Sequence, residues 1–324
     1  TQARQGTVIR NTADSDNQKT CTTTTADAAR TTVNTAITNA VAGDMICVPA
    51  GSATWTTAIS ITKRVSVIGA AGPSAPLAAQ TVITATAGNF TIDNTVGVRI
   101  AQFRWVLGAS GSFTITDSQD FRIDHNTIIR DTAANHTNEA IIIYESNGGG
   151  EPYGLIDNNS FTYGRIEYFG ENFSTPPNSY GGGRRWDDPL ALGGSRAVYI
   201  EDNLFNNDDP ATSLNMAMVD GNLGCRYVGR FNTILGGRWA VHSLQADNQR
   251  GCMLWEIYNN TMINPPGNPN YRPWFIRAGT GMVFHNTTDG NFTFETIDID
   301  NVRTCDNTIP VPSLGKCDGT SFAD

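Results

Sequence analysis

Short segments in which apolar and polar residues alternate recur along most of the chain, and a similar turn follows each of them. In each segment a short, mostly apolar stretch leads to an Asn, and another short stretch follows it. Six segments share this pattern, and their anchoring residues are Asn126, Asn159, Asn203, Asn232, Asn260 and Asn286. Alternation of this kind predicts half-buried β-strands, and its repetition predicts a solenoid.

The spacing of these turns indicates the type of solenoid. Successive anchoring Asn residues are 33, 44, 29, 28 and 26 positions apart. One coil of a parallel β-helix takes about that many residues, and loops on one side absorb the variation. We therefore predict an all-β, single-stranded, right-handed parallel β-helix over residues 44–295. Asn suits the bends because it tolerates a left-handed backbone and because its amide can bond to the same Asn one coil away.

The beginning and the end of the chain show other patterns. Between Thr25 and Gly43 the apolar residues follow helical spacing, with Thr25 or Asp27 as N-cap and Gly43 as terminator. We predict a capping helix over residues 25–43 that covers the open end of the core. Residues 1–24 are then an N-terminal extension, and residues 296–324 are a C-terminal tail or cap.

The six cysteines fall into three local pairs, with no Cys-x-x-Cys metal spacing. Three disulfides are the simpler interpretation, and free buried thiols are the alternative. The first pair would join the capping helix to the first coil, and the second pair occupies nearly equivalent positions on adjacent coils. The expected pairs are Cys21 with Cys47, Cys225 with Cys252, and Cys305 with Cys317.

Composition and charge indicate the compartment in which the protein works and the class of partner that it binds. Disulfides favour a secreted protein at the cell surface or outside the cell. The sequence opens at Thr1 without an apolar signal region, so we expect a mature protein whose signal peptide has been removed. A net charge of −9 and a pI near 4.9 argue against a nucleic-acid partner. An acidic polysaccharide is compatible with that charge where arginines cluster locally. No apolar run is long enough to predict a membrane span.

Several segments resemble a known family. The run from Gly43 to Gly51, with Asp44 and Val-Pro-Ala-Gly, and the run from Ile61 to Gly69 resemble the entry to the pectate-lyase-like superfamily. The runs 198–205, 255–261 and 279–286 are similar to those of secreted bacterial right-handed β-helix repeat proteins. The resemblance covers about residues 25–295 and implies the fold. It implies no single activity, because the superfamily includes lyases, hydrolases, esterases, tailspikes and non-enzymatic surface proteins.

Polar residues at the ends of neighbouring strands are the catalytic candidates. Asp220, His242 and Arg277 each follow an apolar stretch, and stacked coils would place them in one row at steps of ~4.8 Å. Asp220 would orient His242 and raise its basicity, and Arg277 would bind a substrate carboxylate. A uronate lyase needs these two functions, neutralising the carboxylate and removing the adjacent proton. The alternative is that all three are ordinary solvated residues.

Further residues are candidates for substrate binding. Two of them end an earlier strand, three belong to residues 162–196, which we predict to be a long loop, and two belong to the loop after His242. Aromatic and charged side chains on loops suit sugar binding, although a loop folded back onto the core is the alternative. The candidates are Tyr144, Glu145, Arg184, Arg185, Trp186, Asp247 and Arg250.

The sequence indicates no definite cofactor. Calcium is the one metal to consider, at the acidic pairs Asp187–Asp188 and Asp208–Asp209, but their spacing matches no known calcium loop, and acidic pairs on turns are more often solvated.

Two classes of function follow. The first is a carbohydrate-active enzyme, with a polysaccharide lyase favoured over a glycoside hydrolase. A hydrolase would need two carboxylates in one cleft, for which Asp220 with Glu145 or Asp247 is the candidate pair. The second class is a non-catalytic extracellular protein: a filament or sheath subunit that assembles through coil ends or edges, an adhesin, or a glycan-binding module.

Overall fold

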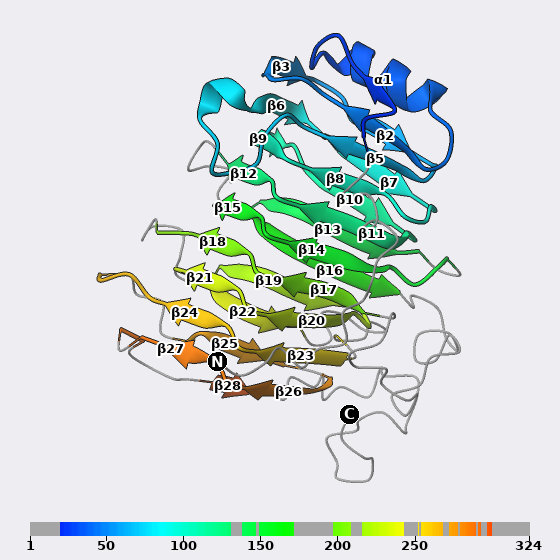
Figure 1. The fold of residues 1–324 in the computed structure, drawn as a ribbon. Coiled ribbons are helices and arrows are strands. Elements are labelled where there is room, and N and C mark those ends of the chain that lie inside the picture. Colours follow the sequence, from blue (N-terminus) through cyan, green and yellow to red (C-terminus); the bar gives the residue numbers. More distant parts are fainter. Residues whose placement is uncertain are drawn as a thin grey trace.

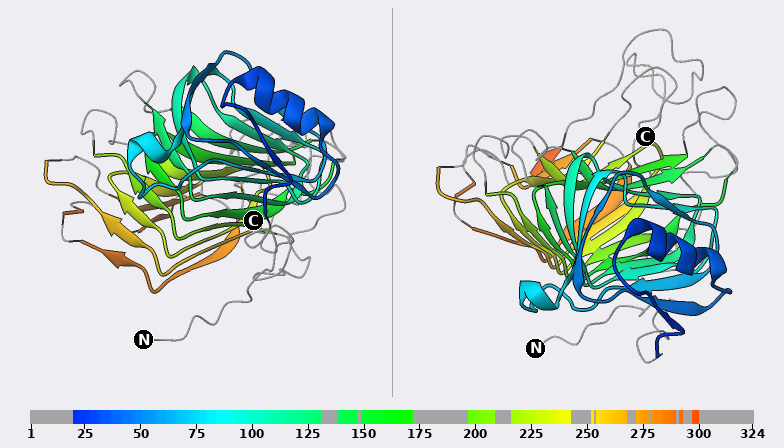
Figure 2. Two further views of the ribbon diagram at one scale, coloured as in Figure 1. Left: turned by 45° about the horizontal axis from the view of Figure 1, so that its top comes forward. Right: turned by 90° about the horizontal axis from the view of Figure 1, so that it is seen from above.

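The computed structural model describes residues 20–130, 138–146, 149–171, 197–208, 216–242, 252, 254–267, 272–277, 279–289, 291–292 and 297–299. Its strands form three parallel sheets that wind around one core (Figures 1 and 2). Each coil visits the three sheets in the same order. The described residues therefore form a right-handed parallel β-helix, which confirms the predicted fold class.

The first sheet has ten strands, in the order β1 (Thr23–Thr24), β2 (Asp44–Cys47), β5 (Val65–Ile68), β8 (Arg99–Ala101), β11 (Gln119–Asp124), β14 (Tyr153–Asp157), β17 (Val198–Glu201), β20 (Arg226–Arg230), β23 (Leu254–Tyr258) and β26 (Thr280–Phe284). The second sheet has nine, namely β3 (Gly51–Trp55), β6 (Thr81–Ala87), β9 (Phe103–Ser110), β12 (Thr127–Arg130), β15 (Ser160–Thr162), β18 (Leu204–Asn206), β21 (Thr233–Leu235), β24 (Thr261–Ile263) and β27 (Thr287–Thr288). The third sheet has nine, namely β4 (Ile59–Ile61), β7 (Phe90–Asp93), β10 (Phe113–Thr116), β13 (Glu139–Glu145), β16 (Arg165–Glu171), β19 (Ala217–Asn222), β22 (Arg238–Val241), β25 (Trp274–Ile276) and β28 (Ile297–Ile299). The helices within the described residues are α1 (Arg30–Asn39) and the short 3-10 helix η2 (Leu77–Ala79).

The core is one continuous column of apolar side chains between the sheets. Strand β9 illustrates its origin, because Phe103, Trp105 and Leu107 are buried while the residues between them are partly exposed. The ring of Trp105 lies 5.5 Å from that of Trp55 two coils earlier, measured between centroids. Each such fully buried side chain contributes roughly 2–3 kcal/mol. Alternation in the sequence thus fills the inside and leaves the other face of each sheet for polar groups.

Helix α1 lies at the N-terminal end of the stack (Figure 1), and its residues Val33 and Ile37 join the core cluster. It begins at Arg30, five residues later than the predicted start. The reason is that the preceding residues are extended: β1 pairs with β2, and the backbone N–H of Thr25 donates to the carbonyl of Cys47 at 2.9 Å. Within the described ranges, no helix is long and apolar enough to cross a membrane.

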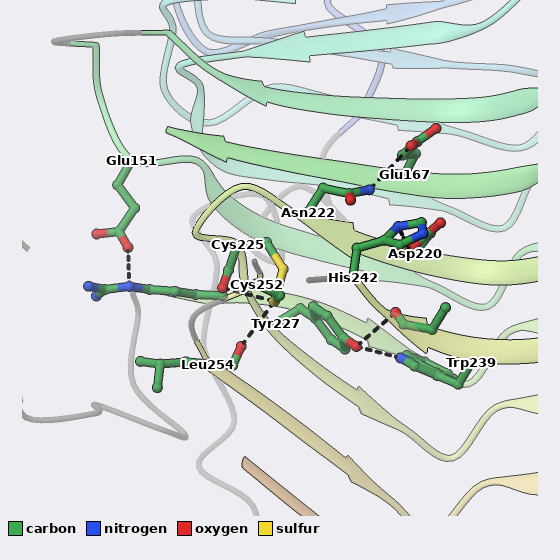
Figure 3. The surroundings of a disulfide bond; sticks show 12 residues. Glu151, Glu167, Asp220, Asn222, Cys225, Tyr227, Trp239, His242, Cys252 and Leu254 are labelled. Carbon is green, nitrogen blue, oxygen red and sulfur yellow. Dashed lines mark hydrogen bonds and ion pairs between the residues drawn. A yellow bond between two sulfur atoms is a disulfide. The ribbon is translucent and has the colours of Figure 1, made fainter. Parts of the chain in front are cut away.

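Two of the predicted disulfides fall within the described residues, and both are present. Cys21 is bonded to Cys47 with a Cα–Cα distance of 5.7 Å, and Cys225 is bonded to Cys252 with one of 4.5 Å (Figure 3). The second bond joins adjacent coils, as expected from the equivalent positions of the two residues. The third predicted pair, Cys305 with Cys317, lies outside the described residues.

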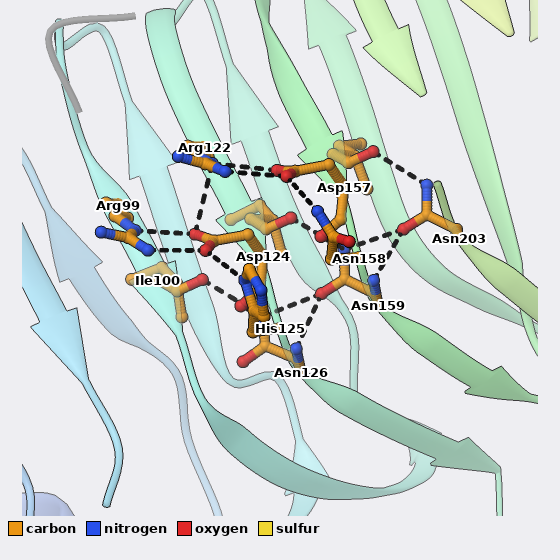
Figure 4. A network of polar contacts seen from close by, with 12 residues as sticks. Arg99, Ile100, Arg122, Asp124, His125, Asn126, Asp157, Asn158, Asn159 and Asn203 are labelled. Atoms are coloured by element: carbon orange, nitrogen blue, oxygen red, sulfur yellow. Dashed lines mark hydrogen bonds and ion pairs between the residues drawn. The ribbon is translucent and has the colours of Figure 1, made fainter. Parts of the chain in front are cut away.

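The predicted Asn ladder runs along the bends between the first and second sheets (Figure 4). Each side-chain amide donates to the side-chain carbonyl of the Asn in the next coil, at 2.9–3.1 Å. The five bonds join Asn126, Asn159, Asn203, Asn232, Asn260 and Asn286 in sequence. Because these amides are buried or nearly so, each bond satisfies groups that would otherwise be costly to bury.

The backbone at these bends differs from our expectation in one respect. The left-handed residue is the one that precedes each ladder Asn, as with His125 (φ 53°), Asp202 (φ 55°) and His285 (φ 52°). The ladder Asn was expected to hold that conformation itself. The preceding residue makes the turn instead, and the amide of the Asn is left to bond along the stack.

Buried ion pairs reinforce the outer face of the first sheet beside the ladder (Figure 4). Arg99 makes a two-pronged contact with Asp124 at 2.8 and 2.7 Å, and Arg122 makes one with Asp157 at 2.9 and 2.8 Å. Nδ1 of His125 lies 2.8 Å from Asp124. The two arginines thus join adjacent coils, and His125 contacts the carboxylate of one of these pairs.

Candidate functional site

The outer face of the third sheet collects charged side chains from β13, β16, β19 and β22, and from the residues that flank β25. In each strand the inward positions hold large apolar residues, such as Tyr168, Val219, Trp239 and Trp274. Because side chains alternate along a strand, the residues between them point outward. We call this surface the polar face.

The register of the polar face differs from the predicted single row. Asp220 pairs with Ala240, not with His242. Gly221 pairs with Val241, so the residues that follow them, Asn222 and His242, lie opposite each other. The backbone N–H of His242 donates to the carbonyl of Gly221 at 2.8 Å. The row that contains His242 and Arg277 is therefore completed by Asn222, and Asp220 belongs to the adjacent row.

Asp220 and His242 nevertheless meet diagonally (Figure 3). Nδ1 of His242 lies 2.7 Å from Oδ1 of Asp220. The carboxyl is 1% exposed, whereas the imidazole side chain is 22% exposed. The two atoms are within hydrogen-bond distance but off the preferred angles, as catalytic contacts often are before a substrate binds. A buried carboxyl thus holds one ring nitrogen of a partly exposed imidazole.

A second group of charges adjoins this pair, and sequence reasoning missed it as a site. Arg165 donates through Nη2 to Glu139 at 2.6 Å and to Glu167 at 2.9 Å, and its Nη1 lies 3.7 Å from Asp220. Asn222 donates to Glu167 at 3.3 Å. Residues 162–196 were predicted to be a loop, but their first part is strand β16. Alternation of Arg165 and Glu167 with the apolar Ile166 was the signal for that strand.

Burial dominates the protonation of the polar face. It raises the pKa of Glu167 to about 8 and that of Asp220 to about 7, and Arg165 opposes both shifts. Burial is also the largest influence on the pKa of Glu139 and would raise it, but the hydrogen bond and the charge of Arg165, with the other hydrogen bonds to this carboxyl, together lower this pKa below its usual value. Near neutral pH the face therefore holds one ionised carboxylate and two carboxyls that bind or release protons readily.

Arginines gather at the C-terminal end of the polar face, around the ring of Phe275. The guanidinium carbons of Arg238, Arg272 and Arg277 lie 4.5, 4.9 and 4.6 Å from its centroid. Arg272 also pairs with Asp298 on β28. The positive charges of Arg277 and Arg238 act on Asp220 and hold its pKa lower than burial alone would.

Tyr144 lies in the same row as His242, two coils earlier than Asn222. Its ring stacks on that of Phe169 with 5.1 Å between centroids and 9° between planes, and Tyr144 is 38% exposed. Glu145 differs: it follows a register shift and is only 4% exposed. Glu145 therefore does not share the exposed position of Tyr144 on the polar face.

The other predicted site residues lie outside the described residues. They are Arg184, Arg185, Trp186, Asp247 and Arg250. Of the acidic pairs considered for calcium, only Asp208 is described, and it accepts a hydrogen bond from the Tyr163 hydroxyl at 3.1 Å. Among the described side chains, no group of three or more His, Cys, Asp or Glu is arranged to hold a metal ion.

Comparisons with known proteins add little to this geometry. No protein-family model and no curated protein matches the sequence. Among solved structures, the chain is similar to an alginate lyase from Paenibacillus sp. str. FPU-7, with 13% identity and a TM-score of 0.45. The match covers 86% of this chain and 100% of that one. A likeness this weak carries no argument about activity.

Proposed function

We propose that this protein is a secreted polysaccharide lyase that cleaves a uronic-acid-containing polymer by β-elimination, and that it belongs to the pectate-lyase-like superfamily. One observation carries the activity: a partly exposed imidazole, His242, is held by the buried carboxyl of Asp220 beside the guanidinium of Arg277. Disulfides across the stack support an oxidising compartment.

The chemistry follows from the roles of these groups. Arg277 binds the carboxylate of a uronate and withdraws charge from it, which acidifies the C–H bond next to the carboxylate. Neutral His242, oriented through Nδ1 by Asp220, removes that proton with its other nitrogen. The electron pair of the C–H bond forms a C=C bond, and the bond to the glycosidic oxygen breaks. The leaving oxygen takes the same proton back from His242, so atoms and charges balance.

The local charge supports an acidic substrate despite the net charge of −9. Three arginines gather within one part of the polar face, and only local charges act strongly on a bound group, because salt screens charges beyond roughly 10 Å. A uronate carboxylate can therefore be bound locally at Arg277 even though the whole protein is acidic.

The direct test is a panel of uronic-acid polymers assayed for the ultraviolet absorbance of unsaturated products. We expect turnover on at least one polymer and a fall in kcat of about 100-fold or more in His242→Asn, because general base catalysis contributes roughly that much. The matched control is His125→Asn, since His125 lies in a turn of the first sheet and Asn suits its left-handed backbone. Absence of unsaturated products on every polymer, or full turnover in His242→Asn, would refute the proposal.

A structural role is the second candidate, and the last coil favours it. Strands β26 and β28 leave Met282 51%, Phe284 38% and Ile299 74% exposed at the C-terminal end of the described stack. Apolar groups at a coil end suit assembly into a filament or sheath. Filaments visible by electron microscopy, without turnover of any polymer, would favour this candidate over the lyase.

A further inference from the structure

Arg165 connects the carboxyl groups of β13, β16 and β19 to the proposed base just after β22. Its Nη2 atom donates to Glu139 at 2.6 Å and to Glu167 at 2.9 Å, and its Nη1 atom lies 3.7 Å from Oδ2 of Asp220. The other oxygen of that carboxyl, Oδ1, lies 2.7 Å from Nδ1 of His242. One guanidinium and one imidazole therefore face the two oxygens of the same buried carboxyl.

The charge of Asp220 decides which nitrogen of His242 is free to act as a base. An ionised carboxylate only accepts hydrogen bonds, so the nitrogen that faces it, Nδ1, must carry the proton, and Nε2 keeps its lone pair. A protonated carboxyl can instead donate to Nδ1, and the neutral imidazole then carries its proton on Nε2. In that tautomer Nε2 has no lone pair with which to remove a proton from a substrate. The base proposed above thus requires Asp220 to be ionised.

Burial works against ionised Asp220. The residue is 1% exposed, and burial is the largest influence on its pKa, which is raised to about 7. Among the positive charges that oppose burial, Arg165 acts more strongly than Arg277 and Arg238 do, whereas the negative charge of Glu139 raises this pKa further. Such a carboxyl is about half ionised near neutral pH, so a change in one neighbouring charge alters its protonation.

The two glutamates that share the guanidinium of Arg165 differ in charge. Burial would raise the pKa of Glu139, but the hydrogen bond and charge of Arg165, with the other hydrogen bonds to this carboxyl, lower it overall, so Glu139 is ionised near neutral pH. Burial raises the pKa of Glu167 to about 8, so Glu167 is mostly protonated there. Further titratable or charged groups act on Asp220 from β20, from β22 and the residue after it, and from the residue after β25, namely Tyr227, Arg238, His242 and Arg277.

We propose that Arg165 is a positioning residue: its positive charge keeps Asp220 ionised, and ionised Asp220 holds His242 in the tautomer with its proton on Nδ1 and its lone pair on Nε2. Glu139 opposes this effect, because it binds the same guanidinium and adds a negative charge near Asp220. The importance of the tautomer for catalysis rests on the proposed function, whereas the tautomer itself can be measured without any substrate.

Nitrogen NMR of isotope-labelled histidine measures the tautomer directly. The chain has four His, so the signals are few, and the one that is lost in His242→Asn belongs to His242. In Arg165→Gln we expect the pH at which neutral His242 passes to the Nδ1–H tautomer to rise by about one unit or more, since a nearby opposite charge shifts the pKa of a carboxyl by roughly 1–3 units. In Glu139→Gln we expect this pH to fall, because Asp220 loses a neighbouring negative charge.

Two further variants separate an effect through Asp220 from a general change of structure or charge. Arg104→Gln removes a positive charge from β9 of the second sheet and should leave the tautomer of His242 unchanged. In Asp220→Asn the side chain cannot ionise, so adding Arg165→Gln or Glu139→Gln should change the tautomer no further.

Opposite shifts in Arg165→Gln and Glu139→Gln, both absent in the Asp220→Asn background, support the proposal. An unchanged tautomer, shifts in the same direction, an equal shift in Arg104→Gln, or shifts that persist in the Asp220→Asn background overturn it. If Arg165→Gln fails to fold, Glu139→Gln decides, because the side chain of Glu139 is 28% exposed and Gln keeps its shape. Opposite shifts without turnover of any polymer would leave the positioning of His242 standing and refute the lyase alone, whereas turnover with an unchanged tautomer would refute the role of Arg165 alone.

Discussion

The buried carboxyl of Glu167 should make the stability of the protein depend on pH, and replacing it with Gln should reduce that dependence. Burial raises its pKa from 4.5 to about 8, so the folded protein binds this proton more tightly than the unfolded chain. The contribution of Glu167 to the free energy of unfolding is fully present below about pH 4.5, and it is lost as the pH rises through about 8.

The magnitude follows from the size of that rise. At about 1.36 kcal/mol per pH unit, ionising Glu167 in the folded state costs at most roughly 5 kcal/mol. The pKa of about 8 already includes the favourable charge of Arg165, so roughly 5 kcal/mol is the upper bound of the effect. Gln keeps the shape of the side chain but cannot ionise. Between pH 5 and pH 9 the Tm of Glu167→Gln should therefore fall less than the Tm of the wild type, and the difference should be several degrees.

Thermal unfolding followed by circular dichroism at both pH values measures this difference. Asp93→Asn is the matched control, because Asp93 is an exposed carboxylate on β7 of the same sheet. If Glu167→Gln loses as much Tm as the wild type between the two pH values, the reasoning about burial is wrong. If Asp93→Asn reduces the loss of Tm between the two pH values as much as Glu167→Gln does, net charge and not burial is responsible.

Three further perturbations test the fold and the core. Asn203→Ala should lower the free energy of unfolding by roughly 2–4 kcal/mol in urea titrations, because it breaks the buried ladder on both sides; an effect below about 0.5 kcal/mol would contradict the role of the ladder. Trp239→Phe should cost roughly 1–3 kcal/mol, since it leaves the Tyr227 hydroxyl without the indole N–H 2.9 Å away; unchanged stability would argue against that bond. Replacing Cys225 and Cys252 together with Ala should cost about 3 kcal/mol for a cross-link of separation 27, with reduction of the wild type lowering Tm similarly; an unchanged Tm in both experiments would contradict it.

The sequence was sufficient for the fold because its dominant pattern is local. Alternation and the recurring Asn turn set the strands, the bends and the ladder within each coil, and each coil needs only its neighbours. The pairing of Cys225 with Cys252 followed from the same repeat. The start of the helix was placed too early because the pairing of Thr23–Thr24 with β2 is a tertiary contact that helical spacing does not reveal.

The register of the polar face could not be obtained in the same way. The strand was expected to end at Asp220, because this polar residue follows an apolar stretch. Strand β19 continues through Gly221 and Asn222, and Gly221 fits there because the Cys225–Cys252 bond and the Tyr227 ring occupy the space where a side chain would lie. The correct row therefore depends on packing between residues that are distant along the strand. Asp220 and His242 are still in contact although they belong to different rows, because their side chains approach each other diagonally across neighbouring strands.

The role of Glu167 was missed for a different reason. The long interval between two Asn turns suggested a loop, and its first residues were included in it. Only the stacking of β16 between β13 and β19 makes Glu167 a neighbour of Asp220. The same stacking provides a carboxyl pair, Glu167 with Asp220, for the competing hydrolase mechanism, so the two mechanisms must be separated by their products.

Cleavage of the polymer in water enriched in heavy oxygen separates them most directly. Elimination breaks the chain without adding water, so we predict unsaturated oligosaccharides that carry no heavy oxygen, detected by mass spectrometry, and their disappearance in His242→Asn. Saturated products with one heavy oxygen at each new reducing end would show hydrolysis and contradict the assignment of His242 as the base of a lyase.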